Sequence, residues 1–144
     1  MKSDLVPLVL LACCLYVSWT DLRSRRIPNL ILLLSFFAIA ALQLSLAGGR
    51  QLVFSLLAGF VPLLVFGLAS LCRPKAVGMG DVKLLALLSF ALGIRAFAVV
   101  LLLASLFALL AATGMTLRKR KTPDGPIPFA PFVTLGLLTY WYGY

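Results

Sequence analysis

The sequence contains no histidine and no glutamate, and its four acidic residues are all aspartate. Only 12% of the chain is charged, against about 25% in soluble domains. Its three cysteines are an odd number set in apolar runs, which argues against a disulfide framework and a metal-ligand spacing. These absences exclude an ordinary soluble domain and a secreted disulfide-rich fold, and we expect no metal and no cofactor. Acid–base chemistry must come from Asp4, Asp21, Asp81 or Asp124, unless lysine, tyrosine or cysteine supplies it.

What the chain has in abundance is apolar sequence. Hydrophobic residues make up 62% of it, and its mean hydropathy is +1.10. A membrane span needs about 20 apolar residues, so this length accommodates about five or six spans. The apolar runs cover residues 4–20, 30–47, 52–72, 82–94, 96–117 and 132–144. The sequence therefore predicts an all-α polytopic membrane protein with six transmembrane helices, forming one domain over residues 1–144.

The formal charge of +9 is distributed unevenly between the gaps that separate these runs. Ten of the thirteen basic residues fall in the first, third and fifth gaps or beside them, and the other three are Lys2, Arg50 and Arg95. Positive charge concentrates on the cytoplasmic side of membrane proteins. We therefore expect cytoplasmic basic loops and both termini outside. This pattern favours contact with anionic membrane lipid and argues against nucleic-acid binding.

Two of the predicted helices are short. The run at residues 82–94 would measure about 20 Å, against a hydrocarbon core of about 30 Å, and the run at residues 132–144 has a similar deficit. Either the bilayer thins, or the preceding segment already lies at membrane depth within a protein-lined cavity. In the second case residues 78–81 (GMGD) and 126–131 (PIPFAP) are neighbours lining one polar cavity open to the cytoplasm.

Two aspartates fall at the predicted cytoplasmic boundary. Asp21 closes the first apolar helix and Asp81 opens the fourth. Asp21 could instead be a solvated partner of Arg23 or Arg25, and Asp81 could be a helix N-cap. As a pair at one membrane depth they favour function. Two carboxylates a few ångströms apart share a proton, so one can activate water while the other protonates the carbonyl or the leaving amine.

The segment at residues 78–81 gives Asp81 a glycine-rich approach. Glycine permits positive φ and close approach of another backbone, so a carboxylate beside such a turn can reach the peptide bond of an extended substrate. Helix ends suggest that Asp81, at a helix N-terminus, is the ionised base and that Asp21, at a C-terminus, is the acid. The charges of Arg23 and Lys83 could reverse this order.

Three segments carry a family resemblance. DLRSRRIPN after the first apolar run, VGMGDVKLLALL at the fourth and PIPFAPF before the last resemble, in that order, the prepilin peptidases. These are GxGD-type aspartic proteases of the bacterial inner membrane. The resemblance implies that Asp21 and Asp81 are the catalytic pair. It also implies motif or substrate-positioning roles for Gly78, Gly80, Lys83, Ile27, Pro28, Asn29, Pro128, Phe129 and Pro131, with Ala130 where glycine is common.

The resemblance also implies a substrate. The family removes the basic leader of type IV prepilins and related pseudopilins at the cytoplasmic face of the membrane. This short form resembles the enzymes of tight-adherence (Flp, type IVb) pilus systems. Larger members carry a cytoplasmic domain with paired cysteines and methylate the new amino terminus. Because these residues contain no such pairing, we expect a peptidase without a methyltransferase domain.

Three other functions fit parts of the sequence. Membrane aspartates beside flexible glycines also suit a small proton-coupled transporter or channel, although both candidate aspartates lie at one membrane face. A non-catalytic scaffold of a pilus or secretion machine would tolerate Asp81→Asn. A GxGD protease acting on other membrane proteins would share the chemistry and differ in substrate.

Overall fold

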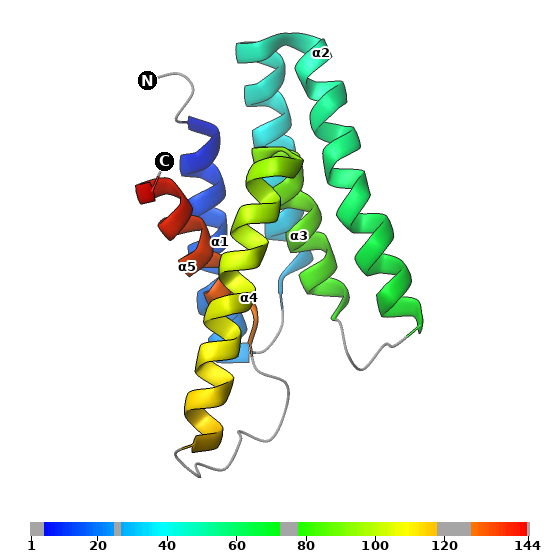
Figure 1. Ribbon diagram of the computed structural model, residues 1–144. Coiled ribbons are helices and arrows are strands. Elements are labelled where there is room, and N and C mark those ends of the chain that lie inside the picture. The colour runs from blue at the N-terminus through cyan, green and yellow to red at the C-terminus, as the bar shows by residue number, and fades with distance from the viewer. Residues whose placement is uncertain (1–4, 25–26, 73–77, 118–127, 144) are drawn as a thin grey trace.

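The computed structural model of the chain describes residues 5–24, 27–72, 78–117 and 128–143. Every regular element in these ranges is an α-helix, and no strand occurs in them, so the predicted all-α class is confirmed. The helices form one bundle (Figure 1). They are α1 (Leu5–Ser24), α2 (Asn29–Cys72), α3 (Met79–Leu92), α4 (Ile94–Leu117) and α5 (Ala130–Gly143).

Helix α2 is a hairpin of two helical arms. Its backbone leaves the helical conformation at Gly48, where φ is 81° and ψ is 173°, a combination that favours glycine because it has no Cβ. The two arms, residues 29–47 and 49–72, run side by side in opposite directions (Figure 1). The five helices thus contain six helical segments, which follow the six predicted apolar runs to within a few residues.

Helix lengths indicate how the bundle relates to a membrane. Among the described residues, three segments are long and apolar enough to cross a membrane, namely Leu5–Ser24, Asn29–Cys72 and Ile94–Met115. The 44 residues of α2 amount to about 66 Å of helix when the two arms are added together, which is about twice the hydrocarbon thickness. Each arm therefore has about the length of one span. The 14 residues of α3 and of α5 measure about 21 Å each, so both are short, as predicted.

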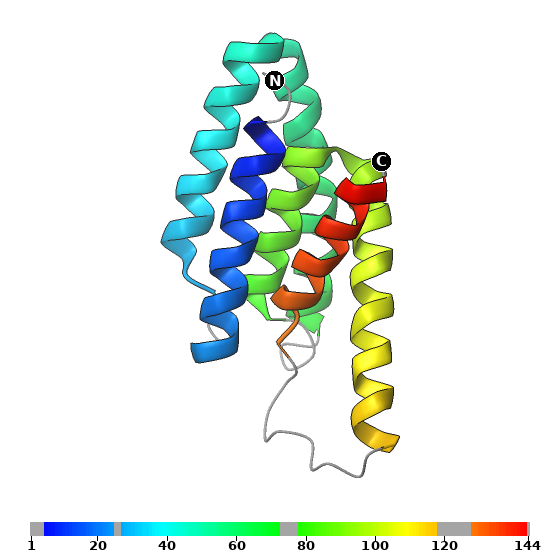
Figure 2. The same cartoon turned by 90° about the vertical axis from the view of Figure 1, so that its left-hand side faces the viewer.

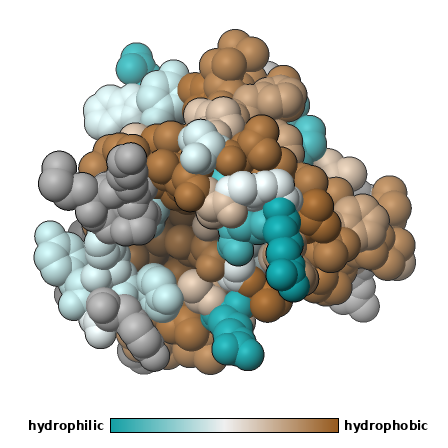
Figure 3. Space-filling model, turned by 90° about the horizontal axis from the view of Figure 1, so that it is seen from above, coloured by the Kyte–Doolittle hydropathy of each residue, from teal (hydrophilic) through white to brown (hydrophobic). Residues whose placement is uncertain are grey.

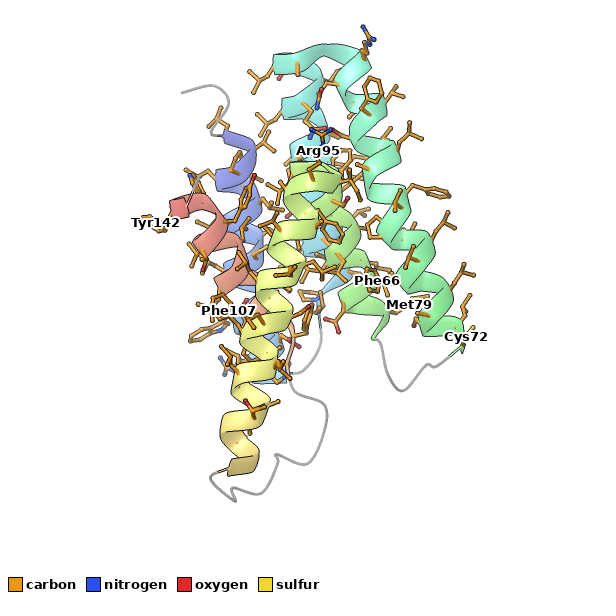
Figure 4. All side chains as sticks on the ribbon, viewed as in Figure 1. Phe66, Cys72, Met79, Arg95, Phe107 and Tyr142 are labelled. Carbon is orange, nitrogen blue, oxygen red and sulfur yellow. The ribbon has the colours of Figure 1, made fainter. Side chains whose placement is uncertain are left out.

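The ends of the helices sort to two ends of the bundle. The start of α1, the end of α5 and the turn at Gly48 lie toward one end (Figures 1 and 2). Arg95, at the start of α4, lies toward that same end, whereas Met79, at the start of α3, lies toward the other (Figure 4). This arrangement agrees with the predicted alternation of the gaps, while the number of spans and the side of each terminus stay predictions.

The centre of the bundle is α3, which packs against α1, α2 and α4. Half of its 14 residues are buried. Ser89 Oγ donates a hydrogen bond to the carbonyl of Ala58 at 2.7 Å and so ties α3 to the second arm of α2. Helix α5 lies close against α4 at Gly136, where a Cβ would come within 2.8 Å of the Val100 oxygen. Small residues allow this close approach of helices in membranes.

The outside of the bundle is largely apolar. Leu102 is 66% exposed, Leu71 71% and Phe37 61%, and many other leucine, valine and phenylalanine side chains are similarly open. Seen from the end that carries the α2 turn, hydrophobic residues occupy much of the outline and hydrophilic ones gather in small patches (Figure 3). Soluble monomers rarely expose apolar surface on this scale, so this surface is suited to lipid.

Candidate active site

Asp21 lies in the last turn of α1 and is only 7% exposed. Its side chain faces α5, where its Oδ2 accepts a hydrogen bond from the backbone N–H of Ala130 at 3.3 Å. The alternative in which Asp21 is a solvated surface carboxylate is therefore wrong. A buried ionisable side chain at the end of a membrane helix is a candidate for function.

The Pro128–Pro131 segment builds the start of α5. The carbonyl of Phe129 accepts the N–H groups of Phe132 and Val133 at 3.1 and 3.2 Å. Pro131 sits in the first helical turn, where a missing N–H leaves no helical bond unmade. The free N–H of Ala130 is the donor that reaches Asp21. The sequence singled out Pro128, Phe129 and Pro131 but did not indicate that this N–H is a donor. The position of Ala130 at a helix start, where backbone N–H groups have no helical partner, could have indicated it.

A buried polar contact fixes α1 against α5 three residues before Asp21. Ser18 Oγ and Thr134 Oγ1 lie 2.5 Å apart. Thr134 Oγ1 also lies within bonding distance of the carbonyl oxygens of Cys14 and Ala130, at 3.2 and 3.0 Å. Because a hydroxyl has one hydrogen to donate and can also accept, Ser18 and Thr134 satisfy each other in the core. This contact holds the register that brings Ala130 to Asp21.

Asp81 lies in the first turn of α3. The N-cap of that helix is Gly78, with φ −69° and ψ 138°, and its carbonyl accepts the N–H of Val82 at 3.2 Å. The alternative in which Asp81 is itself the N-cap is therefore wrong. The extended backbone at Gly78 is open to any residue, so positive φ is not the reason for glycine here.

Gly80 has a packing role. A Cβ on Gly80 would lie 3.0 Å from Cβ of Ile27 and 3.3 Å from its Cδ1. The predicted close approach at this motif therefore involves the side chain of Ile27. The carbonyl of Pro28, the next residue, accepts the N–H of Ile31 at 3.2 Å and starts α2. Ile27, Pro28 and Gly80 thus set the spacing between the start of α2 and the start of α3.

One cavity brings most of the predicted residues together. Its volume is about 340 Å³, and its lining includes both carboxylate residues, Asp21 and Asp81. The other lining residues are Ile27, Asn29, Gly78, Met79, Gly80 and Lys83. We call this cavity the acidic pocket. Pro128, Phe129 and Pro131 are not among its lining residues, and their segment meets the pocket through Ala130 and Asp21.

Lys83 and Asn29 form the polar edge of the acidic pocket. Lys83 Nζ donates a hydrogen bond to Asn29 Oδ1 at 3.1 Å, and both residues are exposed. Asn29 is the first residue of α2, and Lys83 lies two residues after Asp81. The bond therefore joins α2 to α3 at the mouth of the pocket.

The two carboxyl groups differ in electrostatic setting. Asp81 precedes the apolar run that begins at Val82, and burial, followed by the nearby charge of Asp21, raises the pKa of Asp81 to about 6. Asp21 meets the N-terminus of α5, and a helix N-terminus stabilises an anion. These contacts favour the opposite order from the predicted one, with Asp21 as the anion and Asp81 as the acid, and the assignment of acid and base stays a prediction. Burial of Asp81 outweighs its place in the first turn of α3.

The cysteine side chains and the two aspartates that the structure describes form no cluster that could hold a metal ion. Cys13 and Cys14 are buried in the core, and Cys72 is exposed at the end of α2. Asp4, Asp124, Arg25 and the basic segment at residues 118–121 lie outside the described residues.

A helical membrane bundle that encloses two aspartates in one pocket has the groups that an intramembrane aspartic protease requires. Residues 8–113 match the type IV leader peptidase family, and this range includes Asp21 and Asp81. The chain belongs to the type IV leader peptidase family, which confirms the resemblance found in the sequence. No solved structure gives a significant match to the chain.

Several relatives are longer proteins. The chain is 33% identical over 147 residues to the prepilin leader peptidase/N-methyltransferase of Bacillus subtilis (strain 168), a match covering 99% of this chain and 58% of the relative. Proteins of the same name from Aeromonas salmonicida (strain A449) and Aeromonas hydrophila are each 31% identical over an alignment of 150 positions, a match that covers 88% of this chain and 51% of theirs. The chain thus spans about half the length of these relatives.

Proposed function

We propose that the chain is a membrane-embedded aspartic endopeptidase that removes the basic leader of type IV prepilins or pseudopilins at the cytoplasmic membrane face. The observation that carries the proposal is the acidic pocket, which holds Asp21 and Asp81 together in about 340 Å³. Membership of the type IV leader peptidase family supports the substrate class. The proposal needs no metal and no cofactor, because two carboxyl groups supply both the base and the acid.

The proposed reaction starts with Asp21 ionised and Asp81 protonated. Asp21 takes a proton from a water molecule, whose oxygen attacks the carbonyl carbon of the scissile bond, while Asp81 gives its proton to the carbonyl oxygen. The resulting gem-diol collapses as the C–N bond breaks. Asp21 then gives its proton to the leaving nitrogen, and Asp81 regains one from a hydroxyl group. Both side chains return to their starting state, and one water has been consumed.

The contacts of each aspartate support this order. The N–H of Ala130 stabilises a negative charge on Asp21. Asp81 carries a raised pKa, at about 6, so it holds its proton nearer to neutral pH than an ordinary aspartate does. A pair of carboxyl groups whose surroundings separate their proton affinities is the usual basis for assigning an acid and a base.

The proposed membrane setting explains the choice of substrate. We propose six spans in the bacterial inner membrane with both termini outside, so that the acidic pocket faces the cytoplasm. A prepilin carries a basic leader followed by an apolar helix, and the bond between them lies at the membrane surface. The ionised carboxylate of Asp21 would attract the basic leader over the short distances at which charges interact in salt. We assign the chain to Flp-type prepilins on the strength of the sequence resemblance.

An assay of leader removal tests this proposal. The full chain is expressed with a Flp-type prepilin, and removal of the leader is followed as a mobility shift and by sequencing the product's amino terminus. We expect cleavage after the basic leader. A transporter or a non-catalytic scaffold would leave the precursor intact, and a protease for other membrane proteins would cleave those and spare the prepilin. The product's mass also tests methylation, because a peptidase alone leaves the new amino terminus unmodified.

A further inference from the structure

A second cavity lies beside the acidic pocket, between α3 and the two arms of α2. Its volume is about 440 Å³, which is within the range of about 300–1,000 Å³ common for ligand sites. Three helical segments line it with four residues each, starting at Asn29, Leu56 and Lys83. In each segment the four residues follow an i, i+3, i+4, i+7 spacing, which places them on one face of the helix. We call this cavity the apolar groove.

The apolar groove has a buried floor and an open rim. Leu87 and Phe90 of α3 form part of the floor and are 4% and 2% exposed. Leu33 of the first arm is 52% exposed, and Phe60 and Leu63 of the second arm are 53% and 42% exposed. A face from i to i+7 extends about 10 Å, or two helical turns. The groove is therefore an apolar trough about two turns long, open along one side.

The groove and the acidic pocket share one boundary. Asn29 and Lys83 line both cavities, and their 3.1 Å hydrogen bond lies at the junction. On one side of this bond are Asp21 and Asp81, and on the other the lining is apolar. A ligand lying across the junction would meet carboxylates with one part and hydrocarbon with the next.

On the basis of the proposed function, we propose that the apolar groove binds the apolar helix of the substrate, with the leader boundary held at the Asn29–Lys83 junction. A chain that changes from basic to apolar at its cleavage site matches the change from the acidic pocket to the groove. The helix would enter from the side, through the open rim at Leu33 and Phe60, because the groove opens along its length.

The continuity of the groove with the acidic pocket favours a peptide helix over a lipid tail as the occupant. Asp21 attracts a basic leader and repels a lipid phosphate, whereas Lys83 at the junction acts in the opposite direction, so charge alone does not choose between them. Only a peptide whose apolar helix fills the groove also places a bond to be cleaved beside Asp21 and Asp81. Along its two turns the groove is lined by side chains at helical spacing. The side-chain ridges of an apolar helix can pack between them.

Photo-crosslinking tests the proposal at adjacent residues. Leu33 lines the groove, whereas Leu34, its neighbour, does not, and the two are similarly exposed at 52% and 60%. Benzoylphenylalanine is placed at position 33 or 34 of the full chain in membrane vesicles that contain a Flp-type prepilin. Asp81→Asn is included to stop turnover. We expect position 33 to capture the apolar segment of the precursor several-fold more than position 34.

Each outcome decides the proposal. Equal capture at both positions, or capture of lipid alone at position 33, would overturn the groove as a helix site. Leader cleavage by the native chain, measured separately, decides the proposed function. Cleavage by the native chain without capture at position 33 refutes the groove as the helix site and supports the peptidase function. Capture at position 33 without cleavage supports the helix site and refutes the peptidase function. Absence of both refutes both.

Discussion

The backbone N–H of Ala130 donates a hydrogen bond to Oδ2 of Asp21 at 3.3 Å, joining the start of α5 to the last turn of α1 across 109 residues. The C-terminal turn of α1 alone would disfavour a negative charge on Asp21, whereas the N-terminus of α5 favours it. At Asp21 the N-terminus of α5 therefore acts against the C-terminus of α1. Through Asp21, the Pro128–Pro131 segment influences a pocket that it does not line.

Ala130→Pro tests this contact directly. Proline has no N–H and is tolerated at the start of a helix, so the substitution removes the donor and keeps α5. Hydrogen bonds to charged groups contribute about 1.5–3 kcal/mol, so we expect leader cleavage to fall about tenfold or more. Ala130→Gly keeps the N–H and should cleave at close to the native rate. Equal activity in both variants would contradict the contact's role.

The pH dependence of cleavage follows from the raised pKa of Asp81, at about 6. If protonated Asp81 is the acid, the rate falls as pH rises through about 6, because the proton donor is lost. The measurement is kcat/KM between pH 4 and pH 9 with a histidine-free prepilin. A rate that instead rises through pH 6 and stays level would assign Asp81 as the base.

Asp81 also links stability to pH. Its pKa is raised from an ordinary 3.8 to about 6 in the folded chain, so folding favours the protonated form. The fold is therefore weakened by ionisation of Asp81 as pH rises above 3.8, and the loss is complete above about 6. At pH 7.5 we expect Asp81→Asn to raise Tm by about 3–5 °C for each kcal/mol that it adds to the free energy of unfolding. At pH 3 we expect it to leave Tm unchanged. A gain that is equal at both pH values would contradict the linkage.

Gly80 and Gly78 should respond differently to alanine. At Gly80 the new Cβ would lie 3.0 Å from Ile27 Cβ, whereas at Gly78 it would meet Asp81 Oδ2 at 3.4 Å, an ordinary contact. Forced overpacking costs about 1–3 kcal/mol. We expect Gly80→Ala to lower Tm and to reduce the rate of leader cleavage about tenfold. We expect Gly78→Ala to retain most of the native stability and most of the native cleavage rate. Equal losses in the two variants would contradict the packing role of Gly80.

Local sequence patterns predicted much of this fold. Apolar runs of a helix's length, with a short gap between residues 47 and 52, are enough to predict a helical membrane bundle with a turn inside α2. Asp21 and Asp81 could be paired because each lies at the end of an apolar run, at the same predicted membrane depth. The sequence indicated a close approach at residues 78–81 because glycine permits one, but it did not identify the Ile27 side chain as the neighbour of Gly80.

Other features depend on which helices meet, and the sequence does not carry that information locally. The order of acid and base was predicted from the nearest helix end for each aspartate. A neighbour of Asp21 that the sequence did not indicate comes from α5, through Ala130, and burial is the largest cause of the raised pKa of Asp81. The apolar groove was equally out of reach, because its three faces come from separate segments that each look like ordinary lipid-facing helix.

The central claim is that Asp21 and Asp81 together hydrolyse the leader bond. The most direct measurement is the initial rate of leader removal from a Flp-type prepilin by the native chain and by Asp21→Asn, Asp81→Asn and Asp124→Asn, at matched membrane levels. General acid–base groups contribute about 10²–10⁴-fold in rate. The account predicts at least that loss in each of the first two variants and native activity in the third. Native activity in either Asp21→Asn or Asp81→Asn would contradict it.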